Sequence, residues 1–116
     1  MPSEQGEMAD GTLVVRTAKN GDVQLISLCG ELDLANAGTA EAAISASLTN
    51  GETPVVIDMR ELEFIDSTGI ALLVTALSSS KEGGPEVSFI LSSSPAVTRV
   101  LELTGLAERL PLAEAQ

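Results

Sequence analysis

The chain has 116 residues, of which 44% are hydrophobic and 20% are charged, which suits one domain with a single core. Its net charge of -11 disfavours binding to nucleic acid or to an anionic membrane, and favours a basic protein surface as partner. No histidine is present and Cys29 is the only cysteine, which excludes Ser-His-Asp and Cys-His mechanisms and the usual zinc sites.

The chain begins with a polar, acidic segment, residues 1–12, that has no periodic apolar pattern. It lacks the basic start and apolar stretch of a signal peptide, so we expect a flexible lead-in and a cytoplasmic protein. Two β-prone runs then flank Asn20-Gly21, the strongest short hairpin signal. This pattern predicts an antiparallel pair of strands over residues 13–18 and 22–30.

The middle of the chain predicts two helices with a strand between them. Residues 35–48 are rich in alanine and carry apolar side chains at helical spacing. Residues 54–58 are a short, continuous apolar run, which is typical of a central strand buried on both faces. A second helix is predicted to begin near Ser67, after a connector, because apolar residues then recur at intervals of three and four: Ile70, Leu73, Val74 and Leu77.

The last third predicts a strand over residues 87–91 and a third helix. Ser94 followed by proline is typical of a helix start, and Gly105 can take the left-handed conformation that ends a helix. The predicted order is β-β-α-β-α-β-α, which implies parallel pairing with right-handed crossovers. We therefore expect an α/β fold over residues 13–112, with a mixed four- to five-stranded sheet, an antiparallel N-terminal hairpin and three to four helices. Residues 113–116 are expected to form a flexible tail.

The candidate site is Asp66-Ser67-Thr68-Gly69, at the start of the second helix. Functional groups in open α/β sheets gather where strand ends meet helix starts. A hydroxyl there can be phosphorylated without breaking the fold, because the added charge meets free N–H donors and the positive helix end. From the spacing alone, a simple capping role for Asp66 or Ser67 stays open, and Thr68 is an equally plausible hydroxyl.

Asp33 occupies a similar place before the first helix, with Asn36 close to the helix start. A capping role for Asp33 is one interpretation. If both helix starts lie on one rim of the domain, Asp33 and Asp66 would instead flank Ser67. They would then form an acidic docking face for a basic partner.

Four ordered segments resemble the STAS domain of bacterial anti-sigma factor antagonists over about residues 13–112: Gly30–Asp33, Val55–Asp58, Phe64–Ile70 and Val100–Leu106. The resemblance implies that Ser67 is phosphorylated by a partner that is both an anti-sigma factor and a serine kinase. It implies that the unphosphorylated form binds this kinase and frees the sigma factor, that phosphorylation breaks the complex, and that a serine phosphatase restores it. It also implies that Asp33 and Asp66 lie beside the serine on the kinase-facing surface, where Thr68 and Gly69 complete the motif.

Two other functions stay open. STAS domains also serve as non-switching scaffold subunits of stress-sensing or lipid-transport complexes. An enzyme would instead use Asp58, Asp66 and Glu63 to hold magnesium for phosphoryl transfer, but the chain has no P-loop and no clamp of basic residues for a nucleotide. We therefore predict a binding protein with no catalytic residue, no cofactor and no metal.

Overall fold

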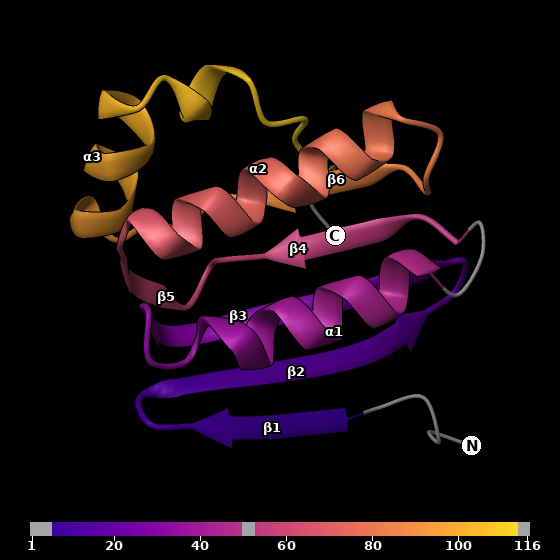
Figure 1. The fold of residues 1–116 in the computed structure, drawn as a ribbon, viewed down its shortest axis with the longest axis horizontal. Coiled ribbons are helices and arrows are strands. Elements are labelled where there is room, and N and C mark those ends of the chain that lie inside the picture. Colours follow the sequence, from indigo (N-terminus) through magenta and orange to yellow (C-terminus); the bar gives the residue numbers. More distant parts are fainter. Residues whose placement is uncertain (1–5, 50–52, 114–116) are drawn as a thin grey trace.

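The computed structural model describes residues 6–49 and 53–113, which form a mixed sheet with helices packed against it (Figure 1). The element order is β-β-β-α-β-β-α-β-α, followed by a short 3₁₀ helix. The elements are β1 (Gly6–Asp10), β2 (Leu13–Asn20), β3 (Val23–Leu32), α1 (Ala37–Thr49), β4 (Val55–Asp58), β5 (Leu62–Ile65), α2 (Ser67–Lys81), β6 (Val87–Ile90), α3 (Pro95–Leu103) and η1 (Leu106–Glu108).

The sheet has the strand order β1-β2-β3-β4-β6, and β5 pairs separately with β3. The pairs β1–β2 and β2–β3 are antiparallel. The pairs β3–β4, β3–β5 and β4–β6 are parallel, as the helical crossovers between them require. The predicted α/β fold with an antiparallel N-terminal hairpin is therefore confirmed.

Two strands are absent from the order predicted from the sequence. Residues 6–10, expected to be part of a flexible lead-in, form β1 and pair with β2 from Gly6 opposite Thr17 to Asp10 opposite Leu13. Residues 62–65, expected to be a connector, form β5. The sheet thus has six strands. The remaining parts of the predicted lead-in and tail, residues 1–5 and 114–116, lie outside the described residues.

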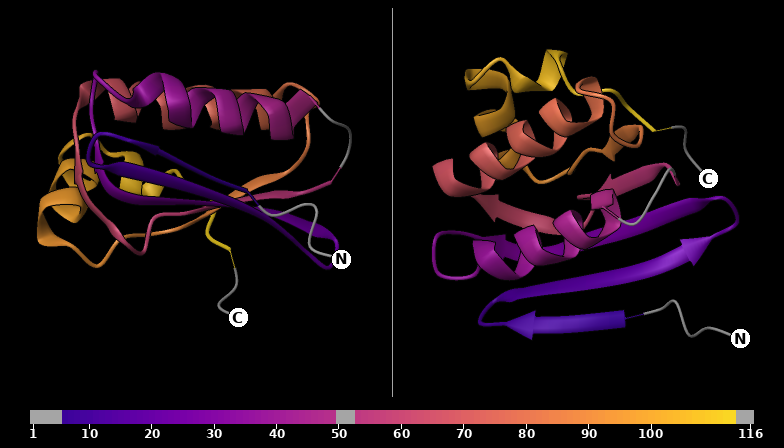
Figure 2. Two further views of the ribbon diagram at one scale, coloured as in Figure 1. Left: turned by 90° about the horizontal axis from the view of Figure 1, so that it is seen from below. Right: turned by 45° about the vertical axis from the view of Figure 1, so that its right-hand side comes forward.

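The helices α1 and α2 lie side by side on one face of the sheet, and α3 packs near β5 at the end of the sheet (Figure 2). The core between sheet and helices is almost entirely aliphatic, with Phe89 as its one buried aromatic side chain among the described residues. The buried face of α1 consists of Ala37, Ala40 and Ile44, and Leu48 is half-buried. The buried face of α2 is turned relative to the prediction, so that Leu72 and Ala76 are buried while Ile70 and Val74 are only half-buried.

A bend in β3 brings the chain to the edge where the predicted site lies. Residues 24–27 of β3 pair with β4, whereas residues 30–32 pair with β5 after a register shift between Gly30 and Glu31. Gly30 has φ +101°, a backbone conformation that favours glycine, and a Cβ atom there would lie 2.0 Å from the carbonyl oxygen of Thr12. Glycine is therefore needed at the bend that precedes Asp33.

Cys29 is half-buried on β3 and is not one of the core residues. It sits opposite Val14, and its Sγ atom is 3.4 Å from Nη1 of Arg16. Burial, together with a hydrogen bond to Glu61, raises the pKa of the thiol. The thiol is therefore protonated and poorly nucleophilic at neutral pH.

Candidate functional site

The start of α2 is capped by Asp66 and not by Ser67. Asp66 has an extended backbone, and its Oδ1 atom accepts hydrogen bonds from the backbone N–H groups of Thr68 at 2.9 Å and of Gly69 at 3.2 Å. These bonds satisfy two of the N–H groups that a helix start leaves without partners. Ser67 is the first residue of the helix and its side chain is exposed. The serine hydroxyl is therefore not needed to cap the helix.

Gly69 allows the first turn of α2 to rest on the ends of β3 and β5. A Cβ atom at this position would lie 2.6 Å from Cγ1 of Ile65 and 2.9 Å from Cδ2 of Leu32. Both of these side chains are fully buried or nearly so, which leaves them little room to move. The glycine of the motif thus fixes how closely the serine approaches the sheet.

Hydrogen bonds of the Asn36 and Asp33 side chains stabilise the turn that leads from β3 into α1. Asn36, which is 3% exposed, accepts a hydrogen bond from the N–H of Asp33 at 2.9 Å and donates one to the carbonyl oxygen of Glu31 at 2.9 Å. Oδ1 of Asp33 accepts a hydrogen bond from the N–H of Ala35 at 3.0 Å. Asp33 therefore shapes this turn locally, and Asn36 is its buried support.

Asp66 joins the two helix starts. Its Oδ2 atom accepts a hydrogen bond from the N–H of Leu34 at 3.2 Å, and its own N–H donates to the carbonyl oxygen of Leu32 at 3.2 Å. The turn that contains Asp33 and the helix start that contains Ser67 consequently lie on one rim of the domain. Sequence reasoning missed Leu34, which is 76% exposed on this rim, and the supporting role of Asn36.

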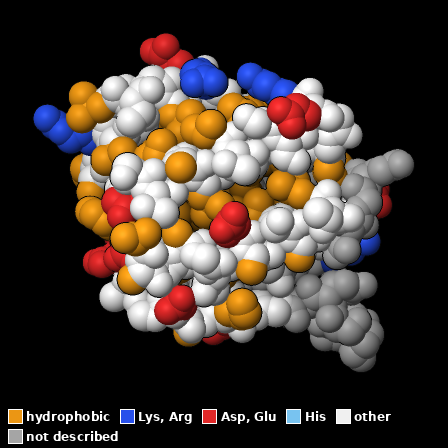
Figure 3. Space-filling view, viewed as in Figure 1, with side chains coloured by type: hydrophobic (Ala, Val, Ile, Leu, Met, Phe, Trp, Pro, Cys, Tyr) orange, Lys and Arg blue, Asp and Glu red, His pale blue; other side chains and the backbone are white. Residues whose placement is uncertain are grey.

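The sequence around Ser67 carries acidic residues and no base close to the serine. The chain contains no lysine or arginine from residue 20 to residue 59 or from residue 61 to residue 80. In Figure 3 the basic side chains lie mainly along the upper margin of the face in view, whereas the acidic ones are spread across it. A negative group added at Ser67 would therefore have no neutralising neighbour in its own segment.

The expectation that a phosphate on Ser67 would meet free N–H donors needs correction. The N–H groups of Thr68 and Gly69 already donate to Asp66. A phosphate on Ser67 would lie next to that carboxylate and would have to compete with it for donors. The positive end of the helix dipole still favours the phosphate, but the net effect is a strong increase in exposed negative charge.

Two of the three residues of the magnesium alternative, Asp58 and Asp66, have other partners. Asp58 is 7% exposed, and its carboxylate accepts hydrogen bonds from Nη2 of Arg60 at 2.8 Å and from the backbone N–H of Arg60 at 2.9 Å. Burial works against ionisation of Asp58, but the hydrogen bonds from Arg60 outweigh it and the pKa of this carboxyl is lowered. The carboxylate of Asp58 therefore stabilises a turn, and the carboxylate of Asp66 stabilises the start of α2 and the turn before α1.

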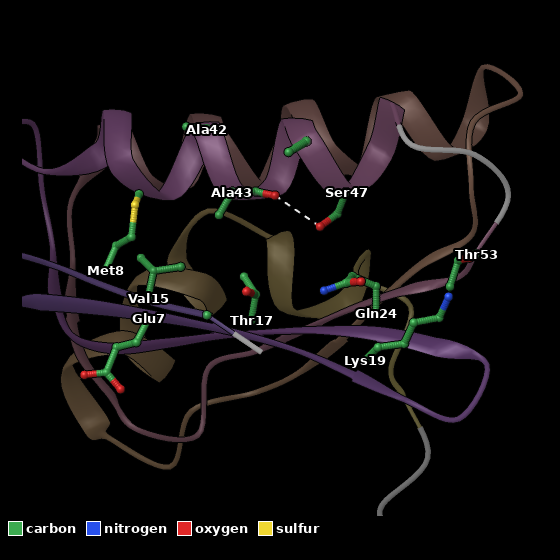
Figure 4. Close-up of a pocket in the computed structure, with 12 residues that line it drawn as sticks. Glu7, Met8, Val15, Thr17, Lys19, Gln24, Ala42, Ala43, Ser47 and Thr53 are labelled. Atoms are coloured by element: carbon green, nitrogen blue, oxygen red, sulfur yellow. Dashed lines mark hydrogen bonds between the residues drawn. The ribbon is translucent and has the colours of Figure 1, made fainter. Parts of the chain in front are cut away.

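A hollow of about 560 Å³ lies between α1 and the strands β1 and β2, and Figure 4 shows its lining. Met8, Val15 and Thr17 rise from the sheet toward Ala43 and Ser47 of α1. None of the site residues predicted from the sequence lines this hollow. The candidate site is thus a surface and not a pocket.

The described residues combine an α/β sheet with an exposed serine at a helix start that Asp66 caps. The chain belongs to the STAS domain family, because a model of this family matches residues 14–115. Within the described residues, no helix combines the length and apolar character that crossing a membrane requires.

Three similar proteins show which members of the STAS domain family the chain resembles. The chain is 32% identical over 99 residues to the anti-sigma-F factor antagonist RsfB of Mycobacterium tuberculosis, covering 84% of this chain and 79% of that protein. It resembles the crystal structure of an anti-sigma factor antagonist from Mycobacterium paratuberculosis, with a TM-score of 0.76 and 26% identity over 92% of this chain and 90% of the other. It also resembles the Bacillus cell fate determinant SpoIIAA in its phosphorylated form, with a TM-score of 0.60 and 25% identity over 86% and 91% of the two chains. Anti-sigma factor antagonists are regulatory binding proteins and not enzymes.

Proposed function

We propose that the protein is an anti-sigma factor antagonist that acts by partner switching in the cytoplasm. Its unphosphorylated form binds an anti-sigma factor serine kinase and thereby frees the sigma factor. Phosphorylation of Ser67 by the same kinase abolishes the binding, and a serine phosphatase restores it. The observation that carries this proposal is the exposed hydroxyl of Ser67 at a helix start that Asp66 already caps.

The physical basis is a change of charge at a contact. A phosphate adds about -1.5 to -2 charges and three acceptor oxygens. On the free domain the added charge is exposed to water, so the fold tolerates it. In a complex the dianion would have to lose its hydration without gaining a matching partner, which costs roughly 3–5 kcal/mol for a buried unpaired charge.

The similarity to known proteins supports this proposal. The relatives from Mycobacterium are anti-sigma factor antagonists, and the SpoIIAA structure is of a phosphorylated form with the same fold. We assign the partner-binding surface to five residues: Asp33, Asp66, Ser67, Thr68 and Gly69. In this assignment the carboxylates shape the rim, and Thr68 and Gly69 hold the serine in place on the helix start.

Phosphosite mapping tests the assignment of Ser67. The purified protein is incubated with an anti-sigma factor kinase of its own organism and ATP, and the modified peptide is sequenced by mass spectrometry. We expect one phosphate, on Ser67, and none on the Ser67→Ala variant. A Thr68→Ala variant is the matched control and is expected to be modified like the wild type. Phosphate on Thr68 or elsewhere would contradict the assignment.

A further inference from the structure

We propose that Leu34 is the apolar anchor of the kinase-binding surface and that it fits an apolar pocket with a basic rim on the partner. This inference rests on the proposed function and adds the residue that carries the affinity. It has three supports: the exposure of Leu34, the rigidity of the turn that presents it, and the charge around it.

Leu34 stands out by its exposure together with its position. Its side chain is 76% exposed, which leaves almost all of a large aliphatic group in water. A single exposed leucine is common on protein surfaces and needs no explanation by itself. Leu34, however, is hydrogen-bonded through its backbone to the residue that precedes Ser67. Any partner that covers the serine hydroxyl would therefore meet Leu34 as well.

The turn that carries Leu34 is ordered before any partner arrives. Asn36 is buried and bridges the N–H of Asp33 and the carbonyl oxygen of Glu31, and Asp33 accepts a hydrogen bond from Ala35. The 3.2 Å bond from Leu34 to Asp66 then fixes the tip of the turn to α2. A side chain presented by a rigid turn loses little conformational freedom on binding, which is the property of an effective anchor.

The charge around Leu34 indicates the chemistry of the partner. Glu31 and Glu63 are exposed, Asp33 and Asp66 are half-buried, and all four lie in the two segments that form the rim. The nearest bases in the sequence are Lys19, Arg60 and Lys81, outside these segments. An exposed apolar side chain in segments that carry carboxylates fits an apolar pocket bordered by lysine or arginine.

The same geometry explains how one phosphate could disable the whole surface. Asp66 contacts both the turn of Leu34 and the first turn of α2, so the anchor and the phosphorylation site form one rigid unit. When Leu34 fills its pocket, Ser67 must lie within the contact. A partner that binds Leu34 must therefore also remove water from Ser67. A phosphate on Ser67 makes this desolvation unfavourable.

The chain offers a matched control for testing this anchor. Leu103, at the end of α3, is 74% exposed, nearly as much as Leu34, but it belongs to a different part of the molecule. We would measure the affinity of the kinase for wild type, Leu34→Ala and Leu103→Ala by isothermal titration calorimetry. Leu34→Ala should weaken binding roughly tenfold or more, whereas Leu103→Ala should bind within about twofold of wild type.

Thermal unfolding of the same variants checks that both remain folded, because neither side chain is part of the core. A Leu34→Met variant keeps an apolar side chain of similar volume and should retain affinity within about threefold. Raising the salt concentration should weaken binding of the wild type and of Leu34→Met alike, as a basic rim requires.

Wild-type affinity in Leu34→Ala, or a loss in Leu34→Met as large as that in Leu34→Ala, would overturn the anchor. A concentration-dependent dimer of the free protein that is lost in Leu34→Ala would also overturn it, because the occupant would then be a second copy of the chain. If the wild type is neither bound nor phosphorylated by the kinase, the proposed function itself fails. If it is bound and Leu34→Ala is bound equally well, only this inference fails.

Discussion

Asp58 and Asp66 both stand at the end of a strand of the same sheet, but their surroundings differ. The carboxylate of Asp58 is buried against Arg60, which supplies both a neutralising charge and a backbone donor. The carboxylate of Asp66 is met only by neutral backbone N–H groups, two from α2 and one from the turn at Leu34. The first carboxylate closes a turn, and the second joins the start of α2 to the turn at Leu34.

An aspartate at a strand end is not in itself a sign of function. What distinguishes the rim at Ser67 is that Asp33 and Asp66 form no ion pair among the described residues and that the rim presents groups without a structural task. The exposed hydroxyl of Ser67 and the exposed side chain of Leu34 are such groups. At Asp58 every polar contact serves the fold.

Gly69→Ala should have the largest effect on stability, because the new Cβ atom would overlap Ile65 and Leu32 where α2 rests on the sheet. We expect a loss of about 1–3 kcal/mol in the free energy of unfolding, measured by urea denaturation. Gly38→Ala in α1 is the control, since nothing lies within 4 Å of a Cβ atom there. It should leave stability unchanged or raise it by up to about 1 kcal/mol. Equal stability of Gly69→Ala and wild type would show that the close approach is not needed.

Asp58→Asn should have the second-largest effect on stability, because it removes the mostly buried negative charge that Arg60 binds. We expect a loss of about 1–2 kcal/mol at neutral pH. Hydrogen bonds from Arg60 lower the pKa of Asp58 in the folded state, despite the opposing effect of burial. The contribution of Asp58 is therefore present above the pKa of an unfolded aspartate, about 3.9, and is lost as the pH falls through the folded pKa.

Urea denaturation at pH 7 and at pH 3 tests whether the stabilisation by Asp58 is lost as the pH falls. The difference in stability between wild type and Asp58→Asn should be large at pH 7 and smaller at pH 3. A difference that grows toward low pH would contradict the role of the ionised carboxylate. Binding of the kinase should not change at pH 7, because Asp58 and Arg60 lie outside the rim.

Substitutions of Asp66 should have the smallest effect on stability. They distinguish its role in capping α2 from its role in holding the turn of Leu34. Asparagine caps helices about as well as aspartate, so Asp66→Asn should cost only a few tenths of a kcal/mol, while Asp66→Ala should cost about 1 kcal/mol. Kinase binding should nevertheless fall in Asp66→Ala, because the turn of Leu34 loses its bond to α2. Unchanged binding by Asp66→Ala would mean that this bond does not position the turn.

Much of the fold follows from local sequence signals. The turn after Asn20, the apolar run that became β4 and the helical spacing after Ser67 each depend on neighbours in the sequence. The strand β1 could not be predicted from local signals, because most of its residues are exposed and an exposed edge strand needs no alternating apolar pattern. Its stability comes from pairing with β2 and from the contact of Glu7 with Arg16.

The sequence groups the candidate residues, but it does not show the contacts that join them. Asp66, Ser67 and Gly69 are close in sequence, so a helix start was sufficient to group them. The bond between Leu34 and Asp66 joins residues that are 32 positions apart, and no local pattern indicates it. For the same reason the sequence could not show that Asp66 already uses the N–H groups expected to receive a phosphate.

The most direct test compares the affinity of the kinase for this protein before and after stoichiometric phosphorylation of Ser67, in a buffer without ATP. We expect the phosphorylated protein to remain folded, as judged by its thermal unfolding, and to bind at least about a hundredfold more weakly. Equal affinity of the two forms would contradict the switch at its centre.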